Sequence, residues 1–133
     1  MTSRDIAKVV RYWREAAEHD LDTARSLFRT GRYDYCLFLC HLSLEKLLKA
    51  LATRKLKEHA PFTHNLLYLA GQAGIALSKT QIAQLDDINR FNVEARYPED
   101  LRAFYEKADK AYAKRYLDVT KGMWLWLQGP LEK

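Results

Sequence analysis

The most apolar stretch of the chain runs from residue 33 to residue 55. Its leucines and its phenylalanine point in nearly every direction at 100° per residue, so a helix here would be apolar around most of its circumference. Such a helix is either the centre of a folded core or a membrane span, and polar residues interrupt the run well short of the about 18 consecutive apolar residues that a span needs. These polar residues are Asp34, His41, Glu45, Lys46 and Lys49. The pattern therefore predicts a central helix over about residues 32–57.

The polar residues of this central helix are ordered. His41, Glu45 and Lys49 recur at every fourth position. Asp34 precedes His41 by seven positions, so all four fall within roughly 60° of one stripe. One interpretation is a solvated edge that carries an ordinary Glu45–Lys49 pair. The other is a polar site inside the bundle or at a subunit interface, in which Glu45 pairs with Lys46 or with an arginine from another helix.

The chain before the central helix has the pattern of a long amphipathic helix. Between residues 4 and 29 the apolar positions recur every three or four residues. Thr2 or Ser3 can cap its start, and Gly31 ends it. The turn that follows is too short for anything but an antiparallel return, so the first two helices are predicted to form a hairpin.

Asp20 lies on the inward stripe of this first helix. A carboxylate that is buried there needs a cation or hydrogen-bond donors, because an unpaired buried charge costs several kcal/mol. The sequence leaves its partner open among Lys46, Lys49 and Arg96. Asp20 is therefore expected to have a structural role.

Shorter helices are predicted after the central one. Thr63 is a good N-cap for a third helix over residues 64–70. Ser78 and Gln81 have the spacing of a capping box and open a fourth helix that extends to about Phe91.

Residues 92–98 should form a structured break, because Pro98 disfavours helical geometry at Tyr97 and suits the first turn of a new helix. Beyond it, apolar positions keep the helical period from residue 101 to residue 127, up to Gly129 and Pro130. The chain, residues 1–133, is therefore predicted to be a single all-α domain, an antiparallel up-and-down bundle of four to five helices.

Composition adds modest constraints to this picture. With 133 residues, 48% of them hydrophobic and 29% charged, the chain is long enough for one globular domain. No basic segment followed by an apolar run begins the sequence, so we expect a cytoplasmic protein with no membrane segment. The net charge of +5 is compatible with an anionic partner such as a nucleotide or RNA, although the basic residues are spread over the whole length.

Cysteines and aromatic residues bear on cofactors and assembly. Cys36 and Cys40 lie among leucines and are expected to be buried reduced thiols, since a metal would need further ligands at fitting spacing; we expect no cofactor and no metal. Tyr116, Trp124 and Trp126 place aromatic rings on more than one side of the last helix, which favours a homodimer.

Candidate chemistry gathers at two predicted breaks. His64 and Asn65 lie at the start of the third helix, and Arg96 and Tyr97 precede the last. A helix start offers free N–H groups to an anion, and an arginine offers a bidentate fork to phosphate. If the two breaks meet, His64 and Arg96 form a small cleft suited to phosphate. The alternative is that His64 is a surface residue and that Arg96 is a structural tie to Asp20 or Glu45.

Five segments, in order and spacing, resemble the HEPN domain family (higher eukaryotes and prokaryotes nucleotide-binding). They are Trp13–Asp20, Gly31–Tyr33, Leu44–Leu51, Thr63–Leu66 and Ala95–Pro98. The resemblance covers almost the whole chain. It implies a helical, usually dimeric bundle that is often paired with a minimal nucleotidyltransferase, the two forming a complex or a toxin–antitoxin pair.

Many members of this family are metal-independent ribonucleases. Their signature is an arginine followed after four to six residues by a histidine at the start of the last long helix; the histidine acts as acid or base and the arginine holds the scissile phosphate. This sequence departs from that signature because no histidine follows His64, although Arg90 and Arg96 lie in the right region. The spacing also occurs from Arg14 to His19 and from Arg54 to His59, as often as chance predicts.

Three hypotheses follow. The first is a non-catalytic HEPN protein that binds a nucleotide, a nucleic-acid phosphate or a nucleotidyltransferase partner. Its ligand-binding residues would be Arg96, Tyr97, His64, Asn65, Glu45, Lys46 and Lys49. The second is a divergent metal-independent ribonuclease toxin in which Arg96 and His64, the latter from another helix or subunit, are catalytic. The third is an assembly module whose polar network only fixes a dimer.

Overall fold

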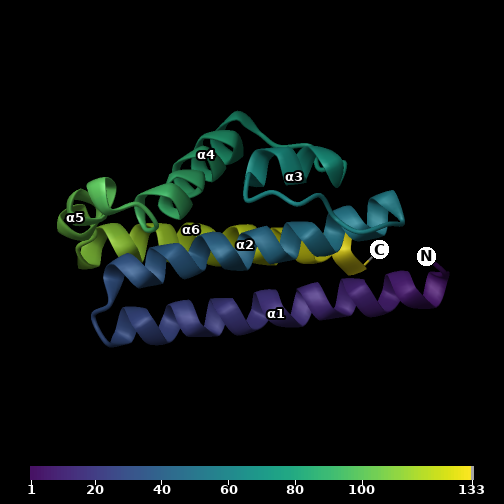
Figure 1. The fold of residues 1–133 in the computed structure, drawn as a ribbon, viewed down its shortest axis with the longest axis horizontal. Coiled ribbons are helices and arrows are strands. Elements are labelled where there is room, and N and C mark those ends of the chain that lie inside the picture. Colours follow the sequence, from purple (N-terminus) through teal and green to yellow (C-terminus); the bar gives the residue numbers. More distant parts are fainter. Residues whose placement is uncertain (133) are drawn as a thin grey trace.

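The computed structural model describes residues 1–132, which form six helices and no strand. The helices are α1 Ser3–Arg29, α2 Tyr33–Leu56, α3 Leu66–Gln72, α4 Lys79–Glu94, α5 Pro98–Lys107 and α6 Lys110–Glu132. Helices α1 and α4 run in one direction and α2 and α6 in the other (Figure 1). The predicted all-α, up-and-down bundle is confirmed, with one more helix than expected because the last predicted helix is divided in two.

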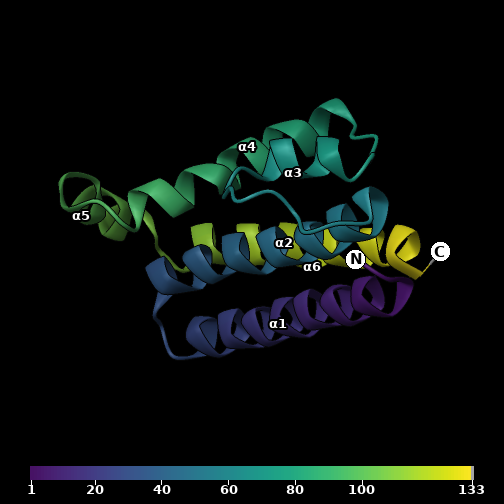
Figure 2. The same cartoon turned by 45° about the vertical axis from the view of Figure 1, so that its right-hand side comes forward.

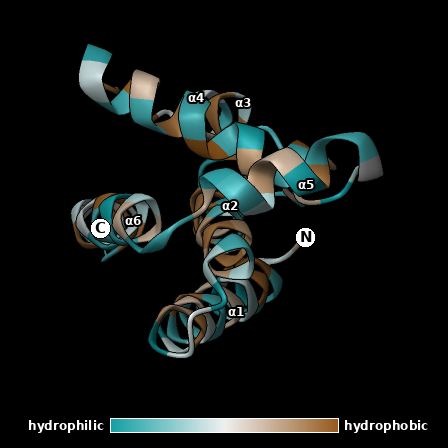
Figure 3. Cartoon of the chain, turned by 90° about the vertical axis from the view of Figure 1, so that its left-hand side faces the viewer, coloured by the Kyte–Doolittle hydropathy of each residue, from teal (hydrophilic) through white to brown (hydrophobic). Residues whose placement is uncertain are grey.

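Helix α2 is the centre of the fold, as its apolar circumference predicts. Viewed along the long helices, α2 is surrounded by α1, α6 and the layer formed by α3 and α4 (Figure 3). Helices α3 and α4 lie on the side of α2 opposite α1 in two further views (Figures 1 and 2). None of the described helices has the length and apolar character needed to cross a membrane.

The hairpin of α1 and α2 forms as predicted. The Thr2 hydroxyl accepts from the Asp5 N–H while the Asp5 carboxylate accepts from the Thr2 N–H, so the first turn of α1 is closed by a capping box. Gly31 then adopts a φ of 77°, a left-handed conformation that glycine adopts without steric cost, and this reverses the chain. The backbone of α2 begins two residues later, one residue after the predicted start.

Asp20 is buried at the interface of this hairpin and is 6% exposed. Its Oδ2 lies 2.7 Å from Lys46 Nζ, so Lys46 is its partner, and the other two candidates, Lys49 and Arg96, are engaged elsewhere. The Lys46 side chain is 28% exposed, which places this ion pair at the edge of the interface. The expected structural role of Asp20 is therefore a tie between α1 and α2.

A second polar tie joins the three long helices. Trp124 Nε1–H of α6 donates to Ser43 Oγ of α2 at 2.9 Å, and the Ser43 hydroxyl donates to the Ala17 carbonyl of α1 at 2.8 Å. Cys36 and Cys40 are free and buried, as predicted. On the outer face of α6, Leu125 and Trp126 remain 74% and 41% exposed.

The second half of the chain differs from the prediction in its boundaries. Helix α4 opens with the predicted Ser78–Gln81 capping box but continues to Glu94, so the break shrinks to residues 95–97. The last predicted helix is interrupted at residues 108–109, where the Asp109 carboxylate accepts from the Tyr112 N–H as a cap does. Helix α6 also continues past Gly129 and Pro130, because a proline in the final turn removes only one terminal bond.

Candidate functional site

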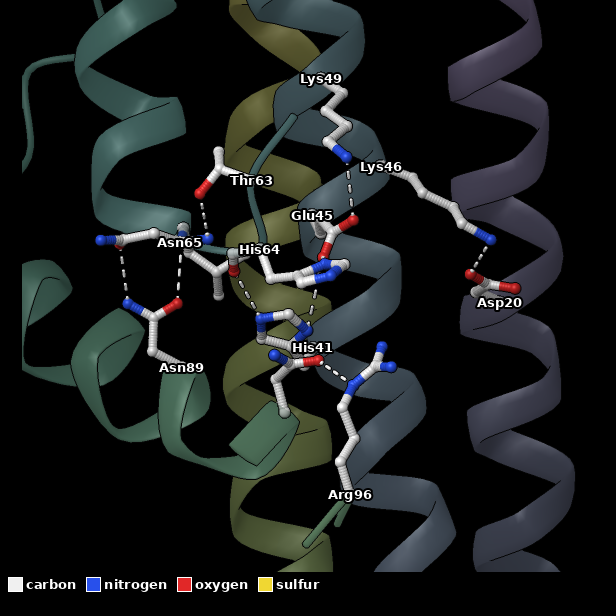
Figure 4. Close-up of polar contacts among 12 residues, drawn as sticks. Asp20, His41, Glu45, Lys46, Lys49, Thr63, His64, Asn65, Asn89 and Arg96 are labelled. Atoms are coloured by element: carbon white, nitrogen blue, oxygen red, sulfur yellow. Dashed lines mark hydrogen bonds and ion pairs between the residues drawn. The ribbon is translucent and has the colours of Figure 1, made fainter. Parts of the chain in front are cut away.

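A buried carboxylate on α2 organises the polar cluster (Figure 4). Glu45 is 4% exposed; its Oε2 accepts from Lys49 Nζ at 3.1 Å and its Oε1 accepts from His64 Nδ1–H at 2.8 Å. The ammonium group of Lys49 also lies 5.2 Å from the centre of the Trp13 ring on α1, a cation–π contact. Two cationic or polar partners thus compensate the desolvation of one carboxylate.

This arrangement decides between the two interpretations of the α2 stripe. His41, Glu45 and Lys49 are all buried, so the solvated edge is wrong, although the Glu45–Lys49 pair that it contained is confirmed. The predicted polar site inside the bundle is present, but the partners predicted for Glu45 are wrong. Glu45 binds His64 of the α2–α3 connection rather than Lys46 or an arginine.

His41 fastens the α2–α3 connection to the core. Its Nε2 lies 2.9 Å from the His64 carbonyl oxygen, and because a carbonyl only accepts, this nitrogen carries the proton. Its Nδ1 is buried, has no hydrogen-bond partner and lies 3.8 Å from Glu45 Oε1. The pKa of His41 is lowered from 6.5 to about 4, chiefly because burial penalises the charged ring. Glu45 and the hydrogen bond to the His64 carbonyl act in the opposite direction, and the smaller influences of the His64 and Arg96 side chains act in the same direction as burial. His41 is therefore neutral at pH 7.

His64 is held at the surface by this network. Its side chain is 55% exposed, and Nδ1–H donates to Glu45, which leaves Nε2 as the nitrogen available to a ligand. A buried carboxylate that fixes the tautomer and orientation of an imidazole is the arrangement that prepares a histidine for general acid–base work. His64 also lines a cavity of about 350 Å³ together with side chains of α4.

The start of α3 does not have the predicted cap. Helix α3 begins at Leu66 rather than at His64, and its N-cap is Asn65, not Thr63. The Asn65 side chain accepts from the N–H groups of Leu67 and Tyr68, and the N–H of Leu66 donates to the Asn89 side chain of α4 at 2.8 Å. The expectation of free N–H groups for an anion is therefore wrong, because side chains already satisfy them.

What remains available in the cavity is a set of donors. The amide oxygens of Asn65, Asn89 and Asn92 each accept from an N–H group that cannot itself accept, which fixes the orientation of all three amides. The NH₂ group of Asn89 donates to Asn65 at 3.1 Å. The NH₂ groups of Asn65 and Asn92 are therefore the amide atoms left for a ligand, and they suit one with acceptor oxygens.

Arg96 lies in the break after α4. Its Nε–H donates to Asn92 Oδ1 at 2.8 Å, and its guanidinium group lies 5.1 Å from the centre of the Phe38 ring. It has no carboxylate partner in the part of the chain that the structure describes, so the predicted tie to Asp20 or Glu45 is wrong. Figure 4 shows the His64 ring and the Arg96 guanidinium group both next to the His41 ring.

The remaining predicted residues divide between the cluster and its surroundings. Tyr97 precedes α5 beside Arg96 and is 52% exposed. Lys46 turns toward Asp20 on α1, away from His64 (Figure 4). Lys49 and Glu45 act inside the network. Among residues 1–132, no three histidine, cysteine or acidic side chains are grouped as metal ligands would be.

The sequence predicted no role for Asn89. It placed His41 on the polar stripe and Asn92 in the break before the last helix, without indicating what either side chain binds. A usable signal existed, because asparagine is a poor helix former, so its occurrence inside an amphipathic helix raises the question of which group its side chain binds. Nothing in the sequence said that Asn89 would meet the start of α3.

The comparisons with known proteins agree with this architecture. The chain shares its fold with the crystal structure of TT1696 from Thermus thermophilus, with a TM-score of 0.79 and 19% sequence identity over 91% of this chain and 97% of that chain. No curated protein matches the sequence at a significant level. The family description "HEPN domain" matches residues 10–129. Because this match spans nearly all of the bundle, the chain belongs to the HEPN domain family.

Proposed function

We propose that this HEPN protein binds a nucleotide or a nucleic-acid phosphate at the cavity lined by His64 and Asn92, with a contribution from Arg96, whose Nε–H donates to Asn92. The observation that carries the proposal is the state of Arg96: Asn92 holds its Nε, while no carboxylate neutralises its guanidinium group in the described part of the chain. A guanidinium group with free Nη donors binds phosphate oxygens bidentately.

The surroundings of Arg96 support the same ligand chemistry. The NH₂ groups of Asn65 and Asn92 offer further donors to acceptor oxygens. The exposed ring of Tyr97, next in the chain, is a surface on which a base can stack. Glu45 and Lys49 support this site by holding His64, whereas Lys46 faces α1 and is left out of the proposed contacts.

Binding of ATP and of a labelled single-stranded RNA, measured without added metal, tests this function. We expect Arg96→Ala to weaken binding at least about tenfold, which corresponds to the loss of about 1.4 kcal/mol. Arg102→Ala is the matched control, since that side chain is 89% exposed and forms an ion pair with Glu106 on the surface. Equal affinity of the Arg96 variant and the wild type for both probes would contradict the proposal.

The Glu45–His64 pair favours a second candidate, a metal-independent ribonuclease. His64 Nε2 would take the proton of a 2′-hydroxyl as its oxygen attacks phosphorus, and would return a proton to the 5′-oxygen that leaves. Arg96 would stabilise the charge that develops on the phosphate. Here the histidine comes from the α2–α3 connection instead of the last helix.

This candidate requires RNA cleavage in the absence of metal. His64→Ala should abolish it, and Glu45→Gln should reduce it and shift its pH profile, because the amide orients the imidazole less well. If the wild-type protein binds RNA but leaves it uncut, the ribonuclease candidate fails and the binding function stands.

Assembly is proposed on two grounds. The exposed Leu125 and Trp126 on α6 favour a homodimer, and the family resemblance implies a minimal nucleotidyltransferase partner in a toxin–antitoxin arrangement. Light scattering on purified protein tests the first point. We expect a dimer that Leu125→Glu converts to a monomer, whereas a monomeric wild-type protein would remove this proposal.

A further inference from the structure

A second cavity is lined by residues from the start of α1 and from the ends of α2 and α6. Figures 1 and 2 show these three helix ends together at one end of the bundle. Its volume is about 490 Å³, within the range of small-molecule sites. None of its lining residues belongs to the cluster around His64. The cavity therefore needs an explanation separate from the proposed function.

Three arginines line this cavity. Arg11 and Arg14 are one turn apart on α1, and Arg54 is half-buried in the last turn of α2. No carboxylate lines the cavity, and none of the three arginines forms an ion pair in the part of the chain that the structure describes. Like charges around one hollow repel each other, and an anion that enters it removes this repulsion.

Apart from Ser3, the rest of the lining is aliphatic. Ile6 and Val10 come from the first turns of α1, and Leu131, which is 6% exposed, comes from the end of α6. At 1.5 Å per residue, Ile6 and Val10 are separated by roughly 6 Å along α1, and Arg14 follows one turn beyond Val10. Ile6 and Val10 therefore lie nearer the start of α1 than Arg14 does, and the cavity presents aliphatic and cationic groups side by side.

We propose that this cavity binds a small amphipathic anion, with a phosphate or carboxylate head and a short hydrocarbon body of roughly six carbons. The head contacts the guanidinium groups of Arg14 and Arg54, which match such oxygens bidentately. The body covers Val10 and Leu131 and removes apolar surface from water.

Calorimetric titration of the full chain with hexyl phosphate tests the proposal. Two further titrations use fragments of this ligand: inorganic phosphate represents the head group, and hexanol represents the hydrocarbon body. Each buried methylene is expected to improve affinity about fourfold, so hexyl phosphate should bind at least about tenfold more tightly than either fragment. Arg14→Ala should weaken it at least about tenfold. Val10→Ser should weaken hexyl phosphate and leave inorganic phosphate unchanged.

Control variants separate this site from the other one. Arg102→Ala should bind hexyl phosphate as the wild type does. Arg96→Ala should lose nucleotide binding yet retain a saturable site for hexyl phosphate that Arg14→Ala weakens, so failure of the proposed function leaves this inference intact. Arg54→Lys accompanies Arg54→Ala, because the half-buried side chain of Arg54 also packs at the end of α2. A lysine there retains the charge without the fork and should give an intermediate affinity.

Three results would overturn the proposal. The first is no saturable binding of hexyl phosphate, and the second is equal affinity for hexyl phosphate and inorganic phosphate. The third is unchanged binding in Arg14→Ala combined with Arg54→Ala. A fourth experiment uses vesicles of phosphatidylglycerol. If the protein binds these vesicles but does not bind dissolved hexyl phosphate, the arginines contact a lipid surface and the small-molecule site is wrong.

Discussion

The three long helices and the layer of short helices are held together in different ways. Helices α1, α2 and α6 bury aliphatic faces against one another, with Ser43 as their central polar tie. The short helix α3 also buries Leu66, Leu69 and Ala70 in this core, but its start and the connection before it are fixed by hydrogen bonds. His41 donates to the His64 carbonyl, while Glu45 accepts from His64 and Asn89 accepts from the Leu66 N–H. Apolar packing tolerates small shifts, whereas hydrogen bonds need defined geometry. We call the interface between the two regions the seam; it contains His41, Glu45, His64 and Asn89. The seam holds polar groups in defined positions, and the candidate site lies there.

Replacement of Glu45 by alanine should break the seam most strongly. It leaves Lys49 buried without a carboxylate and frees His64, and removal of one partner of a buried ion pair costs about 3–5 kcal/mol. Urea unfolding measures the change. Lys114→Ala, which removes one partner of an exposed pair with Asp118, is the control and should change stability by less than about 1 kcal/mol. A Glu45 variant as stable as this control would show that the seam does not depend on the carboxylate.

Acid should weaken the same seam through His41. Burial lowers the pKa of His41 from 6.5 to about 4, so the unfolded chain takes up a proton more readily than the folded one between these values. This contribution to stability is complete above about pH 6.5 and is lost as the pH falls toward 4. It amounts to about 2 kcal/mol between about pH 7 and pH 5.

Unfolding free energies of wild type and His41→Gln at the two pH values isolate this effect. The glutamine amide can still donate to the His64 carbonyl but does not titrate, so the variant should lose about 2 kcal/mol less than the wild type on acidification. Identical pH dependence in both proteins would assign the acid sensitivity to other groups.

Ser43→Ala perturbs the long helices instead. It removes both the acceptor of Trp124 Nε1–H and the donor to the Ala17 carbonyl, at a cost of about 2 kcal/mol. The double variant Ser43→Ala with Trp124→Phe should lose less stability than the two single variants together, because the indole N–H is then no longer left without a partner. Losses that simply add in the double variant would argue against a connected tie.

The smallest expected effect is at the cap of α3. Asn65→Ala should destabilise the protein by about 1 kcal/mol, because the N–H groups of Leu67 and Tyr68 lose their acceptor. Amide hydrogen exchange should speed up in α3 and not in α1. Asn65→Asp retains an acceptor oxygen and should keep most of the protection; equal exchange in both variants would contradict the capping role.

Local patterns predicted the regions whose structure depends on short-range physics. The predicted capping box at Ser78 is confirmed, and of the two predicted caps for the first helix, Thr2 and Ser3, Thr2 is the cap. Both predictions depend on partners that lie within four consecutive residues. The start of α3 was misplaced because Thr63 and Asn65 are both good caps locally. Their competition was settled by Asn89, which binds the Leu66 N–H from a different helix.

By itself, the sequence determined that the chain is helical, that α2 is central and that its polar stripe needs an explanation, because these follow from the period of apolar residues along one segment. Only the tertiary structure decided that Glu45 binds His64, that Asp20 binds Lys46 and that Arg96 has no acidic partner among the described residues. Such pairs join segments far apart in the chain. Their identity depends on the rotation of each helix and on the path of each connection, which one-dimensional periodicity does not specify.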